Sequence, residues 1–300
     1  MKYVVAIDVG GTDIKSALVD ENLKIHQESS IPTPKSLNRG EEIVELALGI
    51  VADYQRGHQV LALGLAFPGV FDDHLGICRW SENLALEDFP VKDLIAKKLD
   101  IPVIAKQDVR TAALAEISAR EATECKNAIF IPIGTGIGAA IILNSQIYTS
   151  NGYEGEIGHL NVGGAYPCLC GKSGCLEAAS SAQAISRAYA QANNGSTAST
   201  QEIAILAKNG DALASKVWDE AMAALARGCE MLITILAPEI IIFGGGLSNA
   251  DQMLIDPLSK NLDDLLTFQK KPKIEVARHG SKAGLIGSAL IAFRSSIRRV

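Results

Sequence analysis

Half of the chain's six cysteines lie close together, in the stretch "CLCGKSGC" at residues 168–175. With a preceding histidine they give the spacing H-x8-C-x-C-x4-C, formed by His159, Cys168, Cys170 and Cys175. Three thiolates and one imidazole make the closed, four-ligand set of a structural zinc site. The alternatives are a redox pair or packed core cysteines, but C-x-C differs from the thioredoxin-type C-x-x-C, and the stretch is polar and rich in glycine. We therefore predict Zn²⁺ in a structural role.

Acidic residues flank the predicted zinc ligands. Glu156 lies three positions before His159, a spacing that puts both on one face of a helical turn, and Glu177 follows Cys175 by two positions. Zinc ligation through one ring nitrogen of His159 would fix the other as an N–H donor. We predict that the ion braces these side chains as one wall of a neighbouring pocket.

Three glycine-rich stretches follow apolar, strand-like runs: "DVGGTDIK" at 8–15, "GTGIGAA" at 134–140 and "FGGG" at 243–246. The P-loop pattern GxxxxGK[ST] is absent, and the second stretch runs into the strand-like "AAIIL", where a dinucleotide-binding fold would begin a helix. Glycine lets backbone N–H groups approach a phosphate closely, although glycines also simply form tight hairpins. The three stretches together indicate a nucleotide held between two halves of the chain.

Two aspartates follow strand-like runs. Asp8, which with Thr12 adds polarity to the first glycine turn, suits Mg²⁺, a cation that prefers carboxylate and water ligands; the alternative is that it helps to form the turn. Asp108 lies in "IPVIAKQDVRTAALAE", where a buried strand passes into a helix. From the residues alone, a role as N-cap, in which the side chain accepts backbone N–H bonds, explains the position of Asp108 as well as a catalytic role does.

Strand-like and helical segments alternate along the chain, which predicts an α/β fold. Strands and strand–glycine-turn–strand units are predicted at 3–19, 60–69, 101–106, 128–143 and 239–246, and helices at 41–55, 91–99, 109–121, 181–192, 211–236 and 283–297. The stretch "NNGSTASTQ" (193–201) is predicted to be a polar loop between two of these helices. The repeated strand–turn–strand unit predicts two α/β domains, with the boundary near residue 120, where the pattern starts again.

Composition and charge narrow the class of protein. The chain has 300 residues, of which 48% are hydrophobic and 21% charged, as in ordinary globular proteins. A net charge of −6 argues against nucleic acid as a partner. The longest apolar runs are interrupted and too short to span a membrane, and no signal peptide precedes the first strand. We predict a cytoplasmic protein without nucleic-acid or membrane partners, in which thiols stay reduced and free to bind a metal.

These stretches together resemble the ROK family of bacterial sugar kinases and repressors, within the actin/hexokinase-like ATPase superfamily. "AIDVGGTDIKSALVD" resembles the first phosphate motif of the family, "IPIGTGIGAAII" the second, "APEIIIFGGGLS" the adenosine motif, and "EGEIGHL" with "CLCGKSGCLE" the zinc signature. The resemblance implies two ribonuclease H-like domains with the active cleft between them, and a last helix that packs on the first domain. The implied domains are 1–120 together with a C-terminal helix at about 284–300, and 121–283, which carries the zinc-binding loop. It also implies ATP as cosubstrate, Mg²⁺, structural Zn²⁺ and a homodimer.

The resemblance further implies roles for individual residues. Asp108 takes the place of the general base that accepts the proton of a sugar hydroxyl. The implied ATP- and phosphate-binding residues are Asp8, Gly10, Gly11, Thr12, Lys15, Gly134, Thr135, Gly136, Gly244, Gly245 and Gly246. The implied sugar-binding residues are Gly69, Asn83, Gln107, Asp108, Glu156, His159 and Glu177. The sequence departs from the family at "KQD", where the usual motif is "END", so that the longer Gln107 would shift or remove an asparagine's contact with a sugar hydroxyl.

We therefore expect an ATP-dependent hexose kinase that phosphorylates the 6-hydroxyl of its substrate, with glucose as the leading candidate. Kinases for fructose, mannose or N-acetylmannosamine and a polyphosphate-dependent glucokinase are the alternatives among enzymes. A sugar-sensing repressor of the same family would carry a helix-turn-helix segment before the first phosphate motif, where this sequence has only a few residues. A catalytically dead sugar-binding protein is disfavoured by Asp108.

Overall fold

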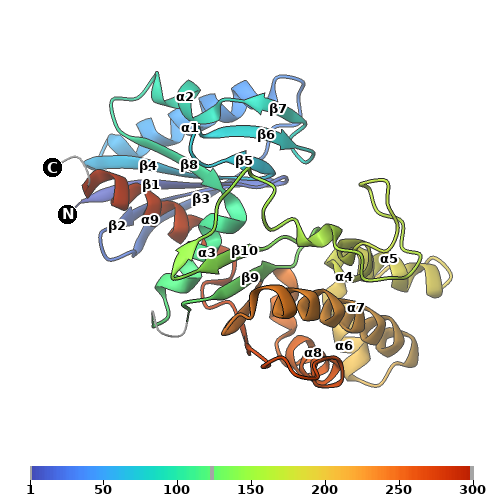
Figure 1. The fold of residues 1–300 in the computed structure, drawn as a ribbon. Coiled ribbons are helices and arrows are strands. Elements are labelled where there is room, and N and C mark those ends of the chain that lie inside the picture. The colour runs from blue at the N-terminus through green and yellow to red at the C-terminus, as the bar shows by residue number, and fades with distance from the viewer. Residues whose placement is uncertain (1, 122–124, 298–300) are drawn as a thin grey trace. The chain divides into compact units, whose positions relative to one another are not determined.

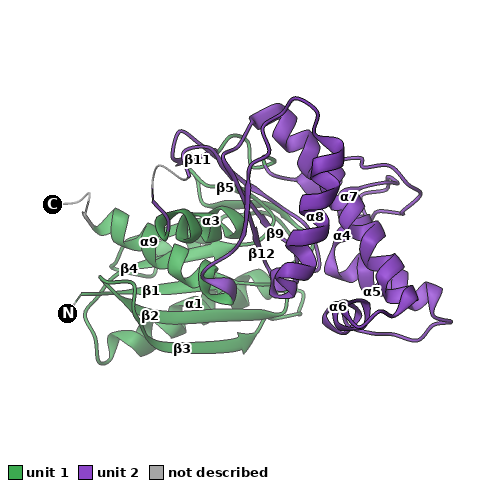
Figure 2. Cartoon of the chain, turned by 90° about the horizontal axis from the view of Figure 1, so that it is seen from below, with its two compact units in different colours: residues 1–119, 149–154, 281–300 green, residues 120–148, 155–280 purple. Residues whose placement is uncertain are grey.

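The computed structural model describes residues 2–121 and 125–297, and it confirms the predicted α/β class. Residues 298–300 of the predicted C-terminal helix, and 122–124 of the predicted second domain, lie outside the described residues. The chain forms two compact units, shown in Figure 2. Unit 1 contains the described residues of 1–119, 149–154 and 281–300, and unit 2 those of 120–148 and 155–280. Residues 149–154, which the sequence prediction assigns to the second domain, thus pack with unit 1; the predicted domain ranges stay a prediction.

Unit 1 is built around a five-stranded sheet with the order β3-β2-β1-β4-β8 and a small three-stranded sheet with the order β5-β6-β7. Its strands are β1 (Tyr3–Val9), β2 (Asp13–Asp20), β3 (Ile25–Pro32), β4 (Val60–Phe67), β5 (Val70–Asp72), β6 (Ile77–Ser81), β7 (Leu86–Phe89) and β8 (Val103–Gln107). Its helices are α1 (Arg39–Gln55), α2 (Val91–Ala96), α3 (Asp108–Ser118) and α9 (Ala283–Ile297). A 3-10 turn, η3 (Gly280–Lys282), precedes α9 and begins at the last residue of unit 2. The sequence analysis did not predict the small sheet.

Alternate residues of β1 face opposite sides of the sheet, as the strand period requires. Val5, Ile7 and Val9 pack into one core with α1 and α2, while Val4 and Ala6 pack into another with α9. In Figure 1, α9 accordingly lies along one face of the sheet and α1 along the other. The sheet is therefore buried on both faces, which accounts for the nearly continuous apolar run of β1.

Small residues bring α9 close to its neighbours in unit 1. A Cβ added at Gly64 in β4 would overlap the backbone carbonyl of Ser288, and one added at Gly287 would overlap the carbonyl of Thr111 in α3. The Ser288 hydroxyl donates a hydrogen bond to the carbonyl of Ile7, at 3.1 Å. The helix is thus fitted to the backbones of β1, β4 and α3.

Unit 2 contains a second five-stranded sheet with the order β11-β10-β9-β12-β13. Its strands are β9 (Ala128–Pro132), β10 (Ala140–Leu143), β11 (Gln146–Ile147), β12 (Ile240–Gly244) and β13 (Lys273–Val276). Its helices are α4 (Leu176–Ser180), α5 (Ala182–Ala192), α6 (Thr200–Lys208), α7 (Ala212–Leu236) and α8 (Gln252–Leu265), with 3-10 turns η1 (Ile157–His159) and η2 (Gly246–Ala250). The buried faces of α7 and α8 share one core with β9 and β12.

The predicted polar loop at 193–201 is wrong at its end, because α6 begins inside it at Thr200. Ser199 caps this helix: its hydroxyl accepts the backbone N–H of Glu202, while the Glu202 carboxylate accepts the backbone N–H of Ser199. This capping box satisfies N–H groups that would otherwise lack partners at the start of the helix. Within the described part of the chain, no helix is both long enough and apolar enough to cross a membrane.

Candidate active site

In unit 1, the predicted site residues follow the carboxyl ends of three parallel strands. β1, β4 and β8 run parallel, with Asp8 paired in register to Ala66 and Phe67 to Gln107. Gly10 and Asp108 come directly after β1 and β8, and Gly69 lies two positions after the end of β4. Ligands of open α/β sheets bind at this edge, outside the carboxyl ends of the strands. The sheet therefore gathers residues that are far apart in the sequence.

The first glycine turn connects β1 to β2 and lies against Asn83. The backbone N–H of Gly10 donates to the carbonyl of Asp13 at 2.9 Å, which closes the turn. A Cβ at Gly11 would come within 3.2 Å of the Asn83 Cβ. A predicted phosphate-binding residue and a predicted sugar-binding residue are thus neighbours within unit 1.

Asp8, near the end of β1, is half-buried and pairs in register with Lys15 on β2. Desolvation by burial raises the pKa of its carboxyl group, and the Lys15 ammonium opposes that effect. Helix α9 begins next to Asp8, because Gly284 leaves room for the carboxylate where a Cβ would overlap it. The carboxylate is an oxygen ligand of the kind that Mg²⁺ prefers, and the backbone N–H groups of the adjacent turn suit the phosphates of a nucleotide.

Asp108 is the first residue of α3, and Gln107 is the N-cap. The Gln107 Oε1 accepts the backbone N–H of Arg110 at 2.8 Å. Asp108 Oδ1 accepts the backbone N–H of the next residue, Val109, at 2.7 Å. The capping role that the sequence left open for Asp108 therefore belongs to Gln107.

In unit 2, the second glycine turn and the "FGGG" stretch meet at the ends of β9 and β12. These strands are parallel, and Gly244 pairs with Pro132. The backbone N–H of Ile133 donates to Gly244 at 2.9 Å, and that of Leu247 donates to Ile133 at 3.1 Å. Gly245 has φ +75°, and a Cβ there would overlap the Ile133 backbone, so that only glycine fits.

A pocket of about 430 Å³ opens beside Gly246. Its other lining residues include Thr200, Lys208, Trp218, Asn249 and Met253. This volume is in the range of small-molecule sites, and the apolar wall with a few polar groups is typical of them. The sequence analysis did not assign these residues to a site, although the "STQE" capping box at 199–202 signals the helix α6, which supplies Thr200 and Lys208.

Glu177 of α4 contacts the second glycine turn. Its Oε2 accepts the backbone N–H of Ile137 at 2.9 Å, and a Cβ at Gly136 would come within 2.6 Å of the same oxygen. Glu156 precedes the turn η1 and His159 is its last residue, and both are exposed. Glu177 therefore links the segment after the last cysteine to the turn that carries Gly134, Thr135 and Gly136.

The four predicted zinc ligands are brought together in unit 2, with their donor atoms all within 4.8 Å of one another. The Cys168 Sγ lies 3.7 Å from the His159 Nδ1, and the Cys170 Sγ lies 3.6 Å from the Cys175 Sγ. Zn–S bonds of about 2.3 Å in a tetrahedron would place ligand atoms about 3.8 Å apart. Because the donor types and separations both match, the cluster fits Zn²⁺.

A model of the ROK family matches residues 4–295. The chain belongs to the ROK family. Among known proteins, a glucokinase of Halalkalibacterium halodurans is 31% identical, over 95% of this chain and 93% of its own length. An N-acetylmannosamine kinase of Pasteurella multocida is 32% identical, over 95% of this chain and 94% of its own length.

Solved ROK structures have the same fold. A ROK family glucokinase from Streptomyces griseus, in complex with glucose and AMPPNP, is 28% identical with a TM-score of 0.83, covering 97% of this chain and 99% of that one. A ROK hexokinase from Thermus thermophilus is 29% identical with a TM-score of 0.81, covering 99% of this chain and 100% of that one. The predicted relationship to ROK sugar kinases is confirmed.

Within this ROK protein, Cys170→Ala should abolish zinc binding, because it removes one of four ligands. Elemental analysis should find one zinc per chain in the wild type and a substoichiometric amount in the variant. We expect a lower melting temperature and reduced activity, since α4 follows Cys175 directly and carries Glu177 to the glycine turn. Cys229→Ala, a buried cysteine of α7 outside the cluster, is the matched control and should keep its zinc. Full activity without zinc after chelation would contradict the prediction.

Proposed function

We propose that this ROK family sugar kinase transfers the γ-phosphoryl group of ATP to the 6-hydroxyl of a hexose, with glucose as the leading substrate. The observation that carries the proposal is the position of Asp108. It begins α3 at the carboxyl end of β8, on the sheet edge where β1 and β4 also end beside the first glycine turn. Sequence similarity to glucokinases, which extends along nearly the whole chain, supports glucose as the substrate.

In the proposed mechanism, Asp108 accepts the proton of the sugar hydroxyl as its oxygen attacks the γ-phosphorus and ADP leaves. Phosphoryl transfer depends mainly on positioning and on the stabilisation of charge. Backbone N–H groups of the two glycine turns would supply part of that stabilisation; the residues are Gly11, Thr12, Thr135 and Gly136. The N–H of Gly134 instead donates to the carbonyl of Gly136 at 3.0 Å and so closes the second turn. Mg²⁺, when bound near Asp8, would neutralise further charge on the phosphates.

The nucleotide and sugar sites are assigned on local contacts within each unit. The pocket beside Gly246 would hold the adenosine part of ATP, since it adjoins the "FGGG" end of β12. Gly69 and Asn83 of unit 1, and Glu156, His159 and Glu177 of unit 2, would contact the sugar. Zinc bound by the cysteine cluster would fix the position of His159 and α4. Closure of the protein on the sugar would exclude water from the reaction.

The experiment that tests the proposal is ADP release measured against a panel of hexoses and N-acetylhexosamines. Each sugar is tested with ATP and with polyphosphate as donor. We expect the highest kcat/KM with glucose and ATP. N-acetylmannosamine is the second candidate, because kinases for that sugar are as similar to this chain as the glucokinases are. A purified, zinc-loaded protein that phosphorylates none of these sugars would refute the proposal.

Gln107→Asn should change the ratio of kcat/KM between sugars. The Gln107 Oε1 already accepts the backbone N–H of Arg110 in α3, and we therefore expect the Nε2 to contact a sugar hydroxyl. Asparagine is a favoured N-cap, and the helix should therefore be preserved, while the shorter side chain moves the amide. A gained or lost hydrogen bond is worth about 0.5–1.5 kcal/mol, or roughly two- to tenfold.

The measurement is the kcat/KM of both proteins on glucose, mannose and N-acetylmannosamine. Gln107→Ala is the companion variant, because it removes the cap and should cost about 0.5–2 kcal/mol of stability. An unchanged ratio across the three sugars in Gln107→Asn would show that Gln107 only caps the helix.

Gly246→Leu should raise the KM for ATP about tenfold, equivalent to ~1.4 kcal/mol, and leave the KM for sugar unchanged. Gly246 lines the pocket, and a Cβ there would meet no atom within 4 Å, so that the new side chain would occupy space proposed for adenosine. Gly57→Leu is the control, since this exposed glycine of unit 1 also has room for a Cβ. Equal effects on both substrates would contradict the assignment.

We also propose a homodimer and a cytoplasmic location. The resemblance to the ROK family supports the first, and light scattering coupled to size exclusion tests it. The cluster of three cysteines and a histidine supports the second, because a reducing compartment keeps thiols available to bind a metal.

A further inference from the structure

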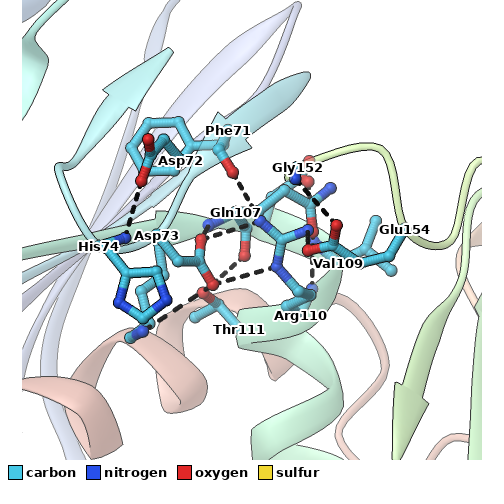
Figure 3. Close-up of polar contacts among 12 residues, drawn as sticks. Phe71, Asp72, Asp73, His74, Gln107, Val109, Arg110, Thr111, Gly152 and Glu154 are labelled. Carbon is cyan, nitrogen blue, oxygen red and sulfur yellow. Dashed lines mark hydrogen bonds and ion pairs between the residues drawn. The ribbon is translucent and has the colours of Figure 1, made fainter. Parts of the chain in front are cut away.

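A buried network of charged side chains surrounds Arg110 in unit 1 (Figure 3). The Arg110 Nε and Nη2 donate to the two carboxylate oxygens of Asp73, at 3.0 and 2.9 Å. The Arg110 Nη1 forms an ion pair with the Glu154 Oε1 at 3.0 Å, and Nη2 also donates to the carbonyl of Phe71 at 2.9 Å. The three charged side chains are 3%, 5% and 8% exposed. Three stretches distant in the sequence are thus joined at one guanidinium.

A buried ionic network of this kind contributes little to the stability of the fold. Taking charges out of water costs free energy that their mutual attraction only partly returns, and well-packed apolar residues often do as well. Lys106, 3.8 Å from Asp73, offsets the surplus negative charge but adds a further ion. The network instead fixes the relative positions of the groups bonded to Arg110, because the planar guanidinium sets the directions of its hydrogen bonds.

One end of the network holds the junction between β8 and α3. Asp73 Oδ1, besides its bond to Arg110, accepts the backbone N–H of Gln107 at 2.9 Å. The backbone N–H of Arg110 in turn donates to the Gln107 side chain. Asp108, between these two residues in the sequence, is therefore fixed by bonds on both sides.

The other end of the network holds the stretch 149–154. The Glu154 Oε2 accepts the backbone N–H of Gly152 at 2.9 Å, so that both carboxylate oxygens are engaged. Gly152 has φ +91° and lies close to the Phe71 carbonyl, a position that suits only glycine. Glu154 is the last residue of this stretch in unit 1, and Glu156 follows two positions later in unit 2.

We infer that Arg110, with Asp73 and Glu154, is a positioning network for the phosphoryl transfer. Its Asp73 side orients the backbone that presents Asp108. Its Glu154 side fixes the point at which the chain leaves unit 1 toward Glu156 and His159. This inference rests on the proposed function, since those residues are the proposed base and the proposed sugar contacts.

The two sides of the network should give different kinetic signatures. Asp73→Asn weakens the hold on the β8–α3 junction and should lower kcat about tenfold, with a smaller change in the KM for sugar; a shift of about 1 Å in a reacting group can cost up to about 10²-fold. Glu154→Gln loosens the segment before Glu156 and should raise the KM for sugar about tenfold, with kcat within about twofold. Neither variant should change the KM for ATP.

The test combines steady-state kinetics with amide hydrogen exchange on the full-length protein. Glu154→Gln should speed exchange in 149–154 at least tenfold, because the Gly152 N–H loses a charged acceptor. Glu45→Gln is the matched control: Glu45 forms an exposed pair with Lys98 in the same unit, and its loss should leave kinetics and exchange unchanged. Arg110→Lys keeps the positive charge but loses the paired hydrogen bonds of the guanidinium, and it should both lower kcat and raise the KM for sugar. This variant replaces either of the others if that one folds poorly.

Two results would overturn the inference. In one, the Asp73 and Glu154 variants lose activity only in proportion to their loss of folded protein, with no separation between kcat and KM. In the other, exchange in 149–154 stays at the wild-type rate in Glu154→Gln. A wild-type protein without kinase activity would instead overturn the proposed function, and the exchange measurement would still decide whether Glu154 anchors this stretch.

Discussion

Asp108→Asn is expected to lower kcat by about 10²–10⁴-fold, the usual contribution of a general base. Asparagine has the shape of aspartate but cannot accept the proton of the sugar hydroxyl at neutral pH. Its Oδ1 can still accept the Val109 N–H, so that the start of α3 should be preserved. The measurement is kcat with saturating sugar and ATP, together with sugar binding by calorimetry, which should change little.

The control for this variant is Asp100→Asn, an exposed aspartate of the same unit, which should keep full activity. Thermal melting of both variants separates catalysis from folding. Near-normal turnover by a well-folded Asp108→Asn protein would show that another group accepts the proton. Early melting would instead show that the Asp108 carboxylate supports the helix.

Gly284→Ala is expected to lower kcat by about 10²-fold, although the residue itself takes no part in the chemistry. A Cβ at this position would overlap the Oδ2 and Cγ atoms of Asp8, and one of the two groups must move. A displacement of about 1 Å at a positioned group is enough for an effect of this size. We also expect half-maximal activity to require a higher Mg²⁺ concentration, because Asp8 is the proposed contact of that ion.

Gly49→Ala is the matched control for this second variant. Gly49 lies in α1, where a Cβ would meet no atom within 4 Å, and replacement by alanine should stabilise the helix by about 0.5–1 kcal/mol. Activity and Mg²⁺ dependence should stay at the wild-type level. If Gly284→Ala also keeps wild-type activity and Mg²⁺ dependence, then the Asp8 carboxylate can move without consequence, and the role proposed for Asp8 is wrong.

The parts of the site that are close in the sequence were predictable. The zinc ligands span a short, glycine-rich stretch whose donor types restrict the possible chemistry, and the structure brings all four together. The glycine turns of both units were predictable for the same reason, because each joins two strands that pair directly with each other.

The parts that depend on tertiary contacts were not predictable. Gln107 caps α3, yet glutamine is not among the favoured N-cap residues, and nothing in its neighbours signals the role. Asp73, Arg110 and Glu154 are separated by tens of positions, and single charged residues are normally expected on the surface. The bond from Glu177 to Ile137 likewise joins segments that only the fold of unit 2 brings into contact.

The packing of α9 has a consequence for the order in which the chain folds. One face of β1 and β4 packs against this helix, and the bond from Ser288 to Ile7 links residues 281 positions apart. Contacts of such high sequence separation form late and slowly. During translation, β1 and β4 must wait with one apolar face exposed until all of unit 2 has been synthesised, whereas unit 2 can complete its own core earlier. Unit 1 is therefore the part of this kinase that we expect chaperones to protect on the ribosome.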